Sequence, residues 1–83
     1  MKTLGEKRVR VDFNNSGSTL VDELKTKTAE LIDLLQEVKN KESRNMTFVE
    51  SETRMELFRL IATAQTKYEE AAMWAVKAVT CEI

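Results

Sequence analysis

Arg59-Leu-Ile-Ala-Thr-Ala-Gln-Thr-Lys-Tyr-Glu-Glu-Ala-Ala-Met-Trp-Ala-Val-Lys-Ala-Val-Thr80 is an unbroken helical pattern without glycine or proline. It is lined with alanine and carries the single tyrosine and the single tryptophan of the chain. A helix with small side chains on one side lets a second helix approach closely. A chain of 83 residues cannot supply enough such partners itself. The stretch therefore predicts an assembly of several chains.

The helix that holds this stretch is expected to begin near Thr47 and to end near Thr80. Residues 47–50 (Thr-Phe-Val-Glu) fit a capping box, in which the hydroxyl and the carboxylate satisfy free amide groups of the first turn. The length is roughly 33 residues, or about 50 Å at about 1.5 Å per residue. Its seam positions follow four- and three-residue steps at Leu57, Ile61, Ala64, Tyr68, Ala71, Ala75 and Ala78.

A first helix is predicted from about Thr19 to about Lys39. Residues 19–22 (Thr-Leu-Val-Asp) resemble a capping box in which Asp replaces the usual Glu. Thr28 fills the one polar slot of an apolar stripe that is otherwise formed by Val21, Leu24, Leu31, Leu35 and Val38. Residues 40–45 are polar and are expected to form a short loop between the two helices.

The expected fold is all-α, a two-helix antiparallel hairpin over residues 19–83 with an extended N-terminal arm over residues 1–18. The second helix is longer than the first can cover. Below roughly 70–80 residues, a single core contributes only about 3–5 kcal/mol. We therefore expect one domain that forms a homo-oligomer, with closed symmetry as the default arrangement.

The arm differs from the rest of the chain in charge and in pattern. It holds four basic and two acidic residues, whereas the remainder holds nine basic and twelve acidic residues. Residues 8–13 (Arg-Val-Arg-Val-Asp-Phe) alternate polar and apolar, which predicts an extended segment. Residues 14–18 (Asn-Asn-Ser-Gly-Ser) predict a loop. An extended arm needs a surface to pack on, and the helices of a neighbouring subunit are the expected surface.

Composition excludes several function classes. The chain has no histidine and no glycine-rich phosphate loop, so we expect no enzyme, no metal site and no cofactor. Its net charge of -1 argues against strong binding to long nucleic acid. Cys81 stands alone and cannot form an internal disulfide. Without a secretory signal or an apolar run of about 18 residues, we expect a cytoplasmic protein with no membrane partner.

Two groups of residues could bind an anionic, aromatic ligand. Arg8 and Arg10 can donate to phosphate in pairs of hydrogen bonds, and Phe13 can stack on a base; the alternative is a solvated arm. Lys25 and Thr28 lie three residues apart on one helix face. The alternative there is a threonine that bonds to the helix backbone beside solvated lysines.

The aromatic and acidic residues of the last helix allow a third, weaker hypothesis. Tyr68 and Trp74 could form a ligand cage, but core aromatics with one polar tip are the more common case. Glu69 and Glu70 do not predict a catalytic pair, because neighbouring residues on a helix point about 100° apart.

Three segments together resemble a family of small phage proteins, the anti-CBASS cyclic-oligonucleotide sponges. These segments are residues 8–16 (Arg-Val-Arg-Val-Asp-Phe-Asn-Asn-Ser), residues 25–33 (Lys-Thr-Lys-Thr-Ala-Glu-Leu-Ile-Asp) and residues 64–80. Residues 69–78 (Glu-Glu-Ala-Ala-Met-Trp-Ala-Val-Lys-Ala) are the most specific part. The helical-hairpin domain of the family is similar to that of a related anti-Thoeris sponge, and the resemblance covers nearly the whole chain.

The resemblance implies a homohexamer that sequesters cyclic dinucleotides such as cGAMP, and cyclic trinucleotides as a second class, without cleaving them. In the family an aromatic of the arm stacks on a base and an early lysine contacts phosphate; by position these are Phe13 and Lys25. The family often has proline where this chain has Asn15. The complete set of expected ligand-binding residues is Phe13, Lys25, Arg8, Arg10, Asn14 and Thr28.

Under this hypothesis the protein works in the host bacterial cytoplasm during infection and blocks activation of the CBASS effector. A near-neutral chain is compatible with it, because a few phosphates in a pocket need only local cations. The main alternative is a coiled-coil protein-interaction module, or a small phage inhibitor of a host protein. A second alternative is a nucleic-acid-binding accessory protein that uses the basic arm.

Overall fold

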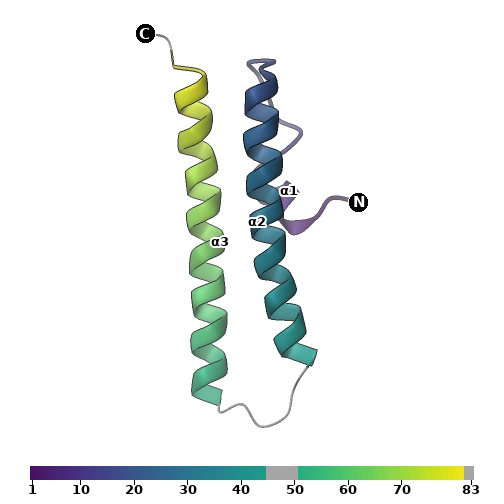
Figure 1. The fold of residues 1–83 in the computed structure, drawn as a ribbon, viewed down its shortest axis with the longest axis vertical. Coiled ribbons are helices and arrows are strands. Elements are labelled where there is room, and N and C mark those ends of the chain that lie inside the picture. Colours follow the sequence, from purple (N-terminus) through teal and green to yellow (C-terminus); the bar gives the residue numbers. More distant parts are fainter. Residues whose placement is uncertain (45–50, 82–83) are drawn as a thin grey trace.

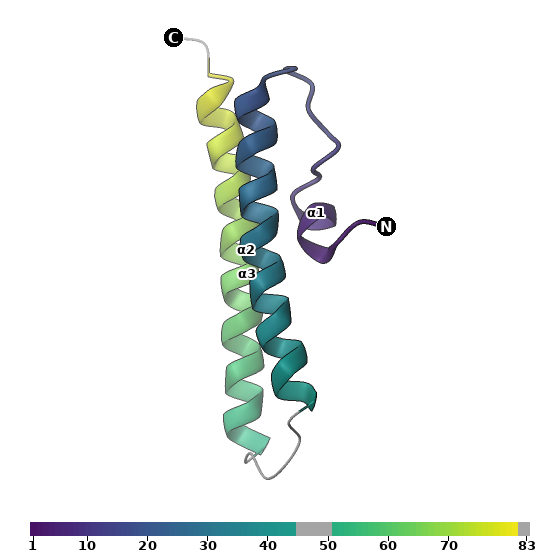
Figure 2. The same cartoon turned by 45° about the vertical axis from the view of Figure 1, so that its right-hand side comes forward.

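Every secondary-structure element is a helix in the part of the chain described by the computed structural model, residues 1–44 and 51–81 (Figure 1). A short helix α1 (Leu4–Arg8) precedes two long helices, α2 (Thr19–Arg44) and α3 (Ser51–Val79). The long helices form a hairpin, in which the last turns of α3 lie beside the first turns of α2 (Figures 1 and 2). The predicted all-α class is confirmed.

The ends of the long helices differ in part from the expected ones. Residues 40–44 continue α2 and do not begin a loop, because this polar segment contains no glycine or proline that would stop a helix. Thr19 is already the first residue of α2, so the cap position falls on Ser18, and Asp22 accepts a hydrogen bond from Asn14 Nδ2 at 3.0 Å. The capping box predicted at residues 19–22 is therefore wrong. The start predicted near Thr47 lies outside the described residues.

A buried glutamine joins the two long helices near their middle. Gln65 of α3 donates from Nε2 to the backbone carbonyl of Ile32 at 3.1 Å, and to Oε1 of Gln36 at 3.3 Å. Ile32 itself is fully buried. The carbonyl of Ile32 is already a helix acceptor, so the amide of Gln65 uses its second lone pair and fixes how the helices lie against each other.

The arm is not extended, because it contains the short helix α1. Thr3 and Glu6 form a complete capping box at the start of α1. At its end, the amide of Arg10 donates to the carbonyl of Lys7 at 3.3 Å, and the amide of Val11 donates to the carbonyl of Glu6 at 3.0 Å. This pair of bonds is the Schellman pattern that ends many helices. The alternation of residues 8–13 thus arises from a helix end followed by a turn, and the prediction of an extended segment there is wrong.

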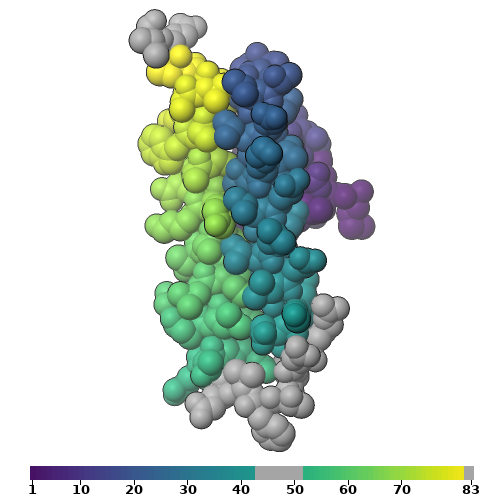
Figure 3. Space-filling view, in the orientation of Figure 1, coloured from purple at the N-terminus to yellow at the C-terminus, as the bar shows by residue number. Residues whose placement is uncertain are grey.

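The arm packs against the helices of its own chain. The prediction that it packs on a neighbouring subunit is therefore wrong. Gly5 lies so close to α2 that a Cβ atom there would overlap the backbone of Ala29. The amide of Gly5 donates to Asp33 Oδ1 at 2.8 Å. Val9 joins the small buried cluster of Ala29, Ile32 and Ala72. In Figure 3 the N-terminal residues project from the edge of the molecule beside α2.

Much of the apolar surface stays exposed in the single chain. Among the described residues, six apolar side chains are buried, whereas twelve large apolar or aromatic side chains are exposed. Trp74 is 61% exposed and Tyr68 is also exposed, so neither is a core aromatic of this chain. Ala72 is buried, but Ala71 and Ala78 lie on the surface. No described helix combines the length and the apolar character needed to cross a membrane.

Candidate ligand groove

A groove of about 660 Å³ lies where the arm meets the long helices. This volume is within the range of roughly 300–1,000 Å³ that is usual for small-molecule sites. One wall comes from the arm, the other comes from the last turns of α3, and one residue of α2 lies between them. The lining residues are Lys7, Arg8, Val9, Arg10, Phe13, Lys25, Glu69, Ala72, Met73, Val76 and Lys77.

Lys25 holds the arm wall in place. Its side chain is only 6% exposed, and its ammonium donates to the backbone carbonyl of Arg10 at 3.1 Å and to that of Phe13. The same Nζ atom lies 5.5 Å from the centre of the Phe13 ring. An ammonium has three N–H donors, and these two contacts use two of them. Lys25 therefore orders the arm.

Arg10 occupies a strained backbone position at the groove. Its φ of 55° lies in the left-handed region, at the residue of a Schellman turn where glycine is usual. This orientation turns its carbonyl towards Lys25 and also towards the amide of Phe13, which donates to it at 2.9 Å. A non-glycine residue here costs roughly 1–2 kcal/mol. The strain is offset by the two hydrogen bonds that the carbonyl accepts.

Arg8 connects the arm to α3. Its Nε atom donates to Glu69 Oε1 at 3.1 Å, and its Nη2 atom donates to Thr66 Oγ1 at 3.2 Å. Both partners sit on α3, so the guanidinium bridges two elements that are about 60 residues apart in sequence. A guanidinium held in this way has fewer N–H donors left for a ligand. The predicted ligand contact at Arg8 is thus also a structural contact.

The open part of the groove is cationic and has an aromatic edge. Phe13 is 55% exposed, so its ring can stack on a planar ligand. Met73 and Val76 supply apolar surface from α3. The lining includes one carboxylate, Glu69, and five cations, which are Lys7, Arg8, Arg10, Lys25 and Lys77. A groove of this charge on a chain of net charge -1 favours a small anion over a long polyanion.

The structure brings four of the six predicted site residues together in this groove: Phe13, Lys25, Arg8 and Arg10. Asn14 lies next to it in sequence and organises the following loop, where its Oδ1 accepts from the amides of Ser16 and Gly17 at 3.2 and 3.1 Å. Thr28 donates to the carbonyl of Leu24 at 2.6 Å, which was the alternative left open for it. Neither Asn14 nor Thr28 lines the groove of this chain.

Sequence reasoning missed the wall that α3 contributes. Met73, Val76 and Lys77 line the groove, although they are about 50 residues from Lys25 in sequence. None of the three was predicted as a site residue, because nothing local distinguishes a lysine that faces a groove from a solvated lysine. Lys7 was missed for a different reason, since it was counted only in the overall charge of the arm.

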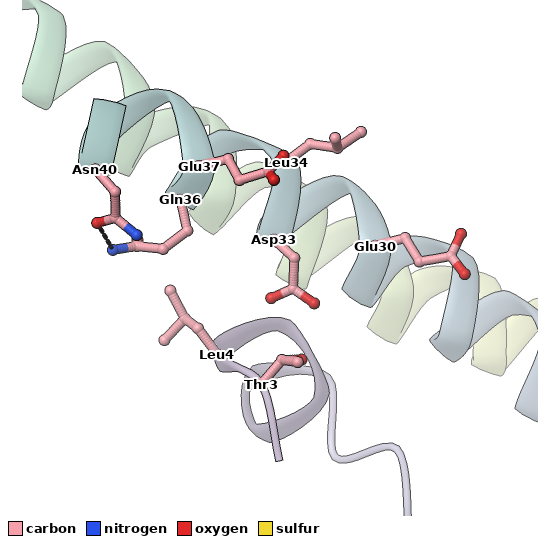
Figure 4. Close-up of a pocket in the computed structure, with 8 residues that line it drawn as sticks. All are labelled: Thr3, Leu4, Glu30, Asp33, Leu34, Gln36, Glu37 and Asn40. Atoms are coloured by element: carbon pink, nitrogen blue, oxygen red, sulfur yellow. Dashed lines mark hydrogen bonds between the residues drawn. The ribbon is translucent and has the colours of Figure 1, made fainter. Parts of the chain in front are cut away.

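A second groove, of about 610 Å³, lies on the other side of α1 and has the opposite charge (Figure 4). Its carboxylates are Glu30, Asp33 and Glu37 of α2, and Thr3 and Leu4 of the arm close its other side. Asp33 points towards α1, whereas Glu30 points away from it (Figure 4). No group of three or more residues suited to a metal ion occurs within residues 1–44 and 51–81. This surface repels phosphate.

The clearest effect on ionisation lies outside both grooves. On the exposed surface of α3, a hydrogen bond from Arg59 lowers the pKa of Glu56, and Glu56 in turn raises the pKa of Arg59. The two residues are three apart on one helix and form an ordinary surface ion pair. They give no reason to look for a site there.

In a comparison with known proteins, a single family model matches both the arm and the hairpin. Residues 5–80 match the family model described as Acb2/Tad1, hairpin domain. This range includes α1 from its second residue, the strained turn, and the described parts of both long helices. No curated protein and no solved structure matches the chain.

Proposed function

The chain belongs to the Acb2/Tad1 hairpin family of anti-CBASS and anti-Thoeris sponge proteins, and we propose which ligand it holds and how. Membership implies a phage anti-defence sponge, which is a binding domain and not a known enzyme family. We propose that the protein sequesters cyclic dinucleotides such as cGAMP, and cyclic trinucleotides as a second class, without cleaving them. It does so in the host bacterial cytoplasm and thereby blocks activation of the CBASS effector.

The observation that carries this proposal is the pairing of an exposed Phe13 with a buried Lys25 in one cationic groove. A cyclic dinucleotide presents two flat bases and two phosphates. Phe13 supplies a stacking face, and the remaining N–H of Lys25 supplies a charge-assisted bond to phosphate. Because Lys25 also fixes the carbonyl of Phe13, the distance between stacking face and cation is set before the ligand arrives.

The assembly we propose is a homohexamer built from antiparallel hairpins. The support for an assembly is the excess of exposed over buried apolar side chains, which a second copy could cover. An interface with two-fold symmetry presents each residue twice, so one Phe13 and one Lys25 per chain would meet both halves of a cyclic dinucleotide. A three-fold axis would suit a cyclic trinucleotide, with Thr28 or arginine side chains converging from three chains.

Sequestration depends on the amount of protein present and on its affinity for the messenger. Each bound messenger is removed from the pool that the effector can sense, so the protein must bind more tightly than the effector does. Nanomolar binding corresponds to about 12 kcal/mol. Two stacked bases at roughly 1–3 kcal/mol each and two charge-assisted phosphate contacts at roughly 1.5–3 kcal/mol each can supply most of that. A groove ordered in advance keeps the entropic cost of binding low.

Isothermal titration of the purified protein with cyclic GMP–AMP tests the proposal, and a native mass spectrum with and without the ligand gives the stoichiometry. We expect tight binding and recovery of intact ligand after the protein is denatured. An absence of heat with several cyclic di- and trinucleotides at micromolar concentration would sink the proposal. Recovery of linear nucleotide would show a hydrolase instead.

The alternative is a protein-interaction module, and the exposed apolar surface is the observation that favours it. Leu20, Leu31, Leu34 and Leu60 are exposed on the long helices, and they could face a host protein as well as a second copy. This alternative predicts no rise in melting temperature with cyclic nucleotides. Binding of a ligand to the native state alone would raise it.

A further inference from the structure

Gln65 lies where apolar packing does little to hold α3 at one position along α2. From Gln65 to the end of α3, the buried and half-buried apolar residues are Ala72, Ala75, Val76 and Val79. All four are small, so they form shallow ridges that interlock weakly with a facing helix. Apolar packing therefore gives this half of α3 only a weak preference for one register over a register that is shifted by a turn.

The contact that Gln65 makes with α2 is polar. Gln65 is only 5% exposed, and its Nε2 atom donates to Oε1 of Gln36 at 3.3 Å as well as to the carbonyl of Ile32 at 3.1 Å. Gln36 and Gln65 are the two glutamines of the whole sequence. Backbone carbonyls repeat along a helix, so a carbonyl alone does not select a register. A shift of one turn, however, would separate the two glutamine side chains by about 5.4 Å.

A second contact between the long helices has the same register. Lys39 Nζ lies 5.7 Å from the centre of the Phe58 ring. Lys39 is seven residues after Ile32, and Phe58 is seven residues before Gln65. Seven residues are about two helical turns, so the two contacts report one continuous register.

The cationic groove follows this register on the other side of Gln65. Lys25 is seven residues before Ile32, Ala72 is seven residues after Gln65, and both line the groove. A shift of α3 by one turn would move its wall of the groove by about 5.4 Å past Lys25. The arm would not follow, because it packs on α2 through Gly5. The two walls would then no longer face each other as they do here.

We propose that the Gln36–Gln65 pair positions the two walls of the cationic groove by fixing the register of α3 on α2. This inference rests on the proposed function and adds a positioning pair that lies outside the ligand contacts. In a shifted register, one of the two N–H donors of Gln65 would stay buried without its side-chain acceptor, which is costly. The bridge from Arg8 to α3 opposes a shift less, because its ion pair is partly exposed.

The test replaces Gln65 in the full chain and follows stability, affinity and the number of conformations. Polar residues in a helix seam specify register at a cost in stability, so Gln65→Leu should melt at the same temperature or higher. The methyl group of Ala72, which is buried at the groove, should give several NMR signals in this variant. With the native register and one shift in each direction equally populated, about one third of the chains hold the groove, and calorimetry should show cyclic GMP–AMP binding about three-fold more weakly. Saturating ligand should restore one signal.

Two further variants complete the experiment. Gln65→Leu combined with Gln36→Leu should behave as the single variant does, because it leaves no amide of the pair unpartnered. Asn40→Leu is the matched control: Asn40 is exposed, and its Oδ1 atom accepts from Gln36 Nε2 at 3.3 Å (Figure 4). This variant exchanges an amide for the same apolar side chain but keeps the pair. It should give one Ala72 signal and unchanged affinity.

The outcomes separate a positioning role from a stabilising one. A lower melting temperature of Gln65→Leu with one Ala72 signal would overturn the inference, since Gln65 would then only add stability. One Ala72 signal with unchanged affinity would overturn it as well. If the unchanged chain bound no cyclic nucleotide, the proposed function would fail, whereas the number of Ala72 signals would still decide whether the pair fixes the register.

Discussion

The two ends of α1 differ in backbone strain and in charge. At the N-terminal end, Thr3 Oγ1 accepts from the amide of Glu6 at 3.1 Å, and Glu6 Oε1 accepts from the amide of Thr3 at 2.9 Å. Asp33 takes the amide of Gly5 as well. At the C-terminal end, Arg10 holds a left-handed backbone and a buried Lys25 supports it. One end is relaxed and acidic, whereas the other end is strained and cationic.

The two features that reduce stability lie at the same end of α1. A lysine with its ammonium removed from water and an arginine at a glycine position both reduce stability unless something offsets them. Both occur at the cationic groove, and neither has a counterpart in the acidic groove. The hydrogen bonds at the N-terminal end of α1 thus stabilise the arm against α2. The contacts at the C-terminal end position Phe13 and the cations of the groove.

The largest expected effect comes from undocking the whole arm with Gly5→Ala. The added methyl would overlap the backbone of Ala29, which cannot move aside as a flexible side chain could. Both ends of α1 would leave α2 together. Loss of the Phe13 stacking face and of the cations beside it should weaken binding of cyclic GMP–AMP by roughly 100-fold or more, measured by calorimetry.

Gly17→Ala is the control for that experiment. Gly17 has a φ of 69° but nothing within contact distance of an added Cβ, so this variant meets backbone strain without a clash. It should lose about 1 kcal/mol of stability and keep most of its affinity. If Gly5→Ala bound as well as Gly17→Ala, the docked arm would not be needed for the groove.

The second effect is specific to the strained end. Lys25→Met keeps an apolar stem of similar length but removes the donor to the carbonyls of Arg10 and Phe13. The carbonyl of Arg10 keeps the amide of Phe13 as a donor, whereas the carbonyl of Phe13 loses the ammonium. An unpaired carbonyl costs roughly 1–3 kcal/mol, so the turn should relax towards water. We expect binding weaker by roughly 10- to 100-fold and a lower melting temperature at fixed protein concentration. A melting temperature that stayed the same would mean that the turn does not depend on Lys25.

The third prediction separates strain from charge at Arg10. Glycine accepts the left-handed φ freely, so Arg10→Gly should raise stability by about 1 kcal/mol, which is roughly 4–8 °C in a domain of this size. It also removes one cation from the groove, so the affinity for cyclic GMP–AMP should fall several-fold. Arg10→Lys should keep both the strain and the charge. A variant that gained stability without losing affinity would show that the guanidinium takes no part in binding.

The sequence predicted the long helices well because their signal is periodic and long. Leu57, Ile61 and the alanines that follow repeat over many turns, so a local error at one end leaves the helix in place. The prediction for the arm was wrong because its signal is short and not periodic. A single five-residue helix depends on packing against α2, which the local sequence does not reveal. Arg10 occupies the Schellman position where a glycine usually marks the end of a helix, so this signal is absent from the sequence.

Part of that failure was avoidable, and part was not. Residues 3–6 (Thr-Leu-Gly-Glu) fit a capping box, so the start of α1 could have been found. Phe13 and Lys25 were assigned through the family resemblance, and the structure places both in one groove. The α3 wall could not be foreseen, because Lys77 and the arm line the same groove only once the hairpin has formed.

The smallest effect is expected at the relaxed end. Asp33→Ala removes the acceptor for the amide of Gly5, but that bond is only part-buried beside an open groove, so water can replace the carboxylate. The loss should be about 0.5–1.5 kcal/mol of stability, with affinity for cyclic GMP–AMP reduced by less than about three-fold. Asp33→Asn keeps an acceptor oxygen at the same place and separates the bond from the charge. If Asp33→Ala weakened binding as much as Lys25→Met does, the two ends of α1 would support the groove equally, since the strained end would then have no closer link to the ligand.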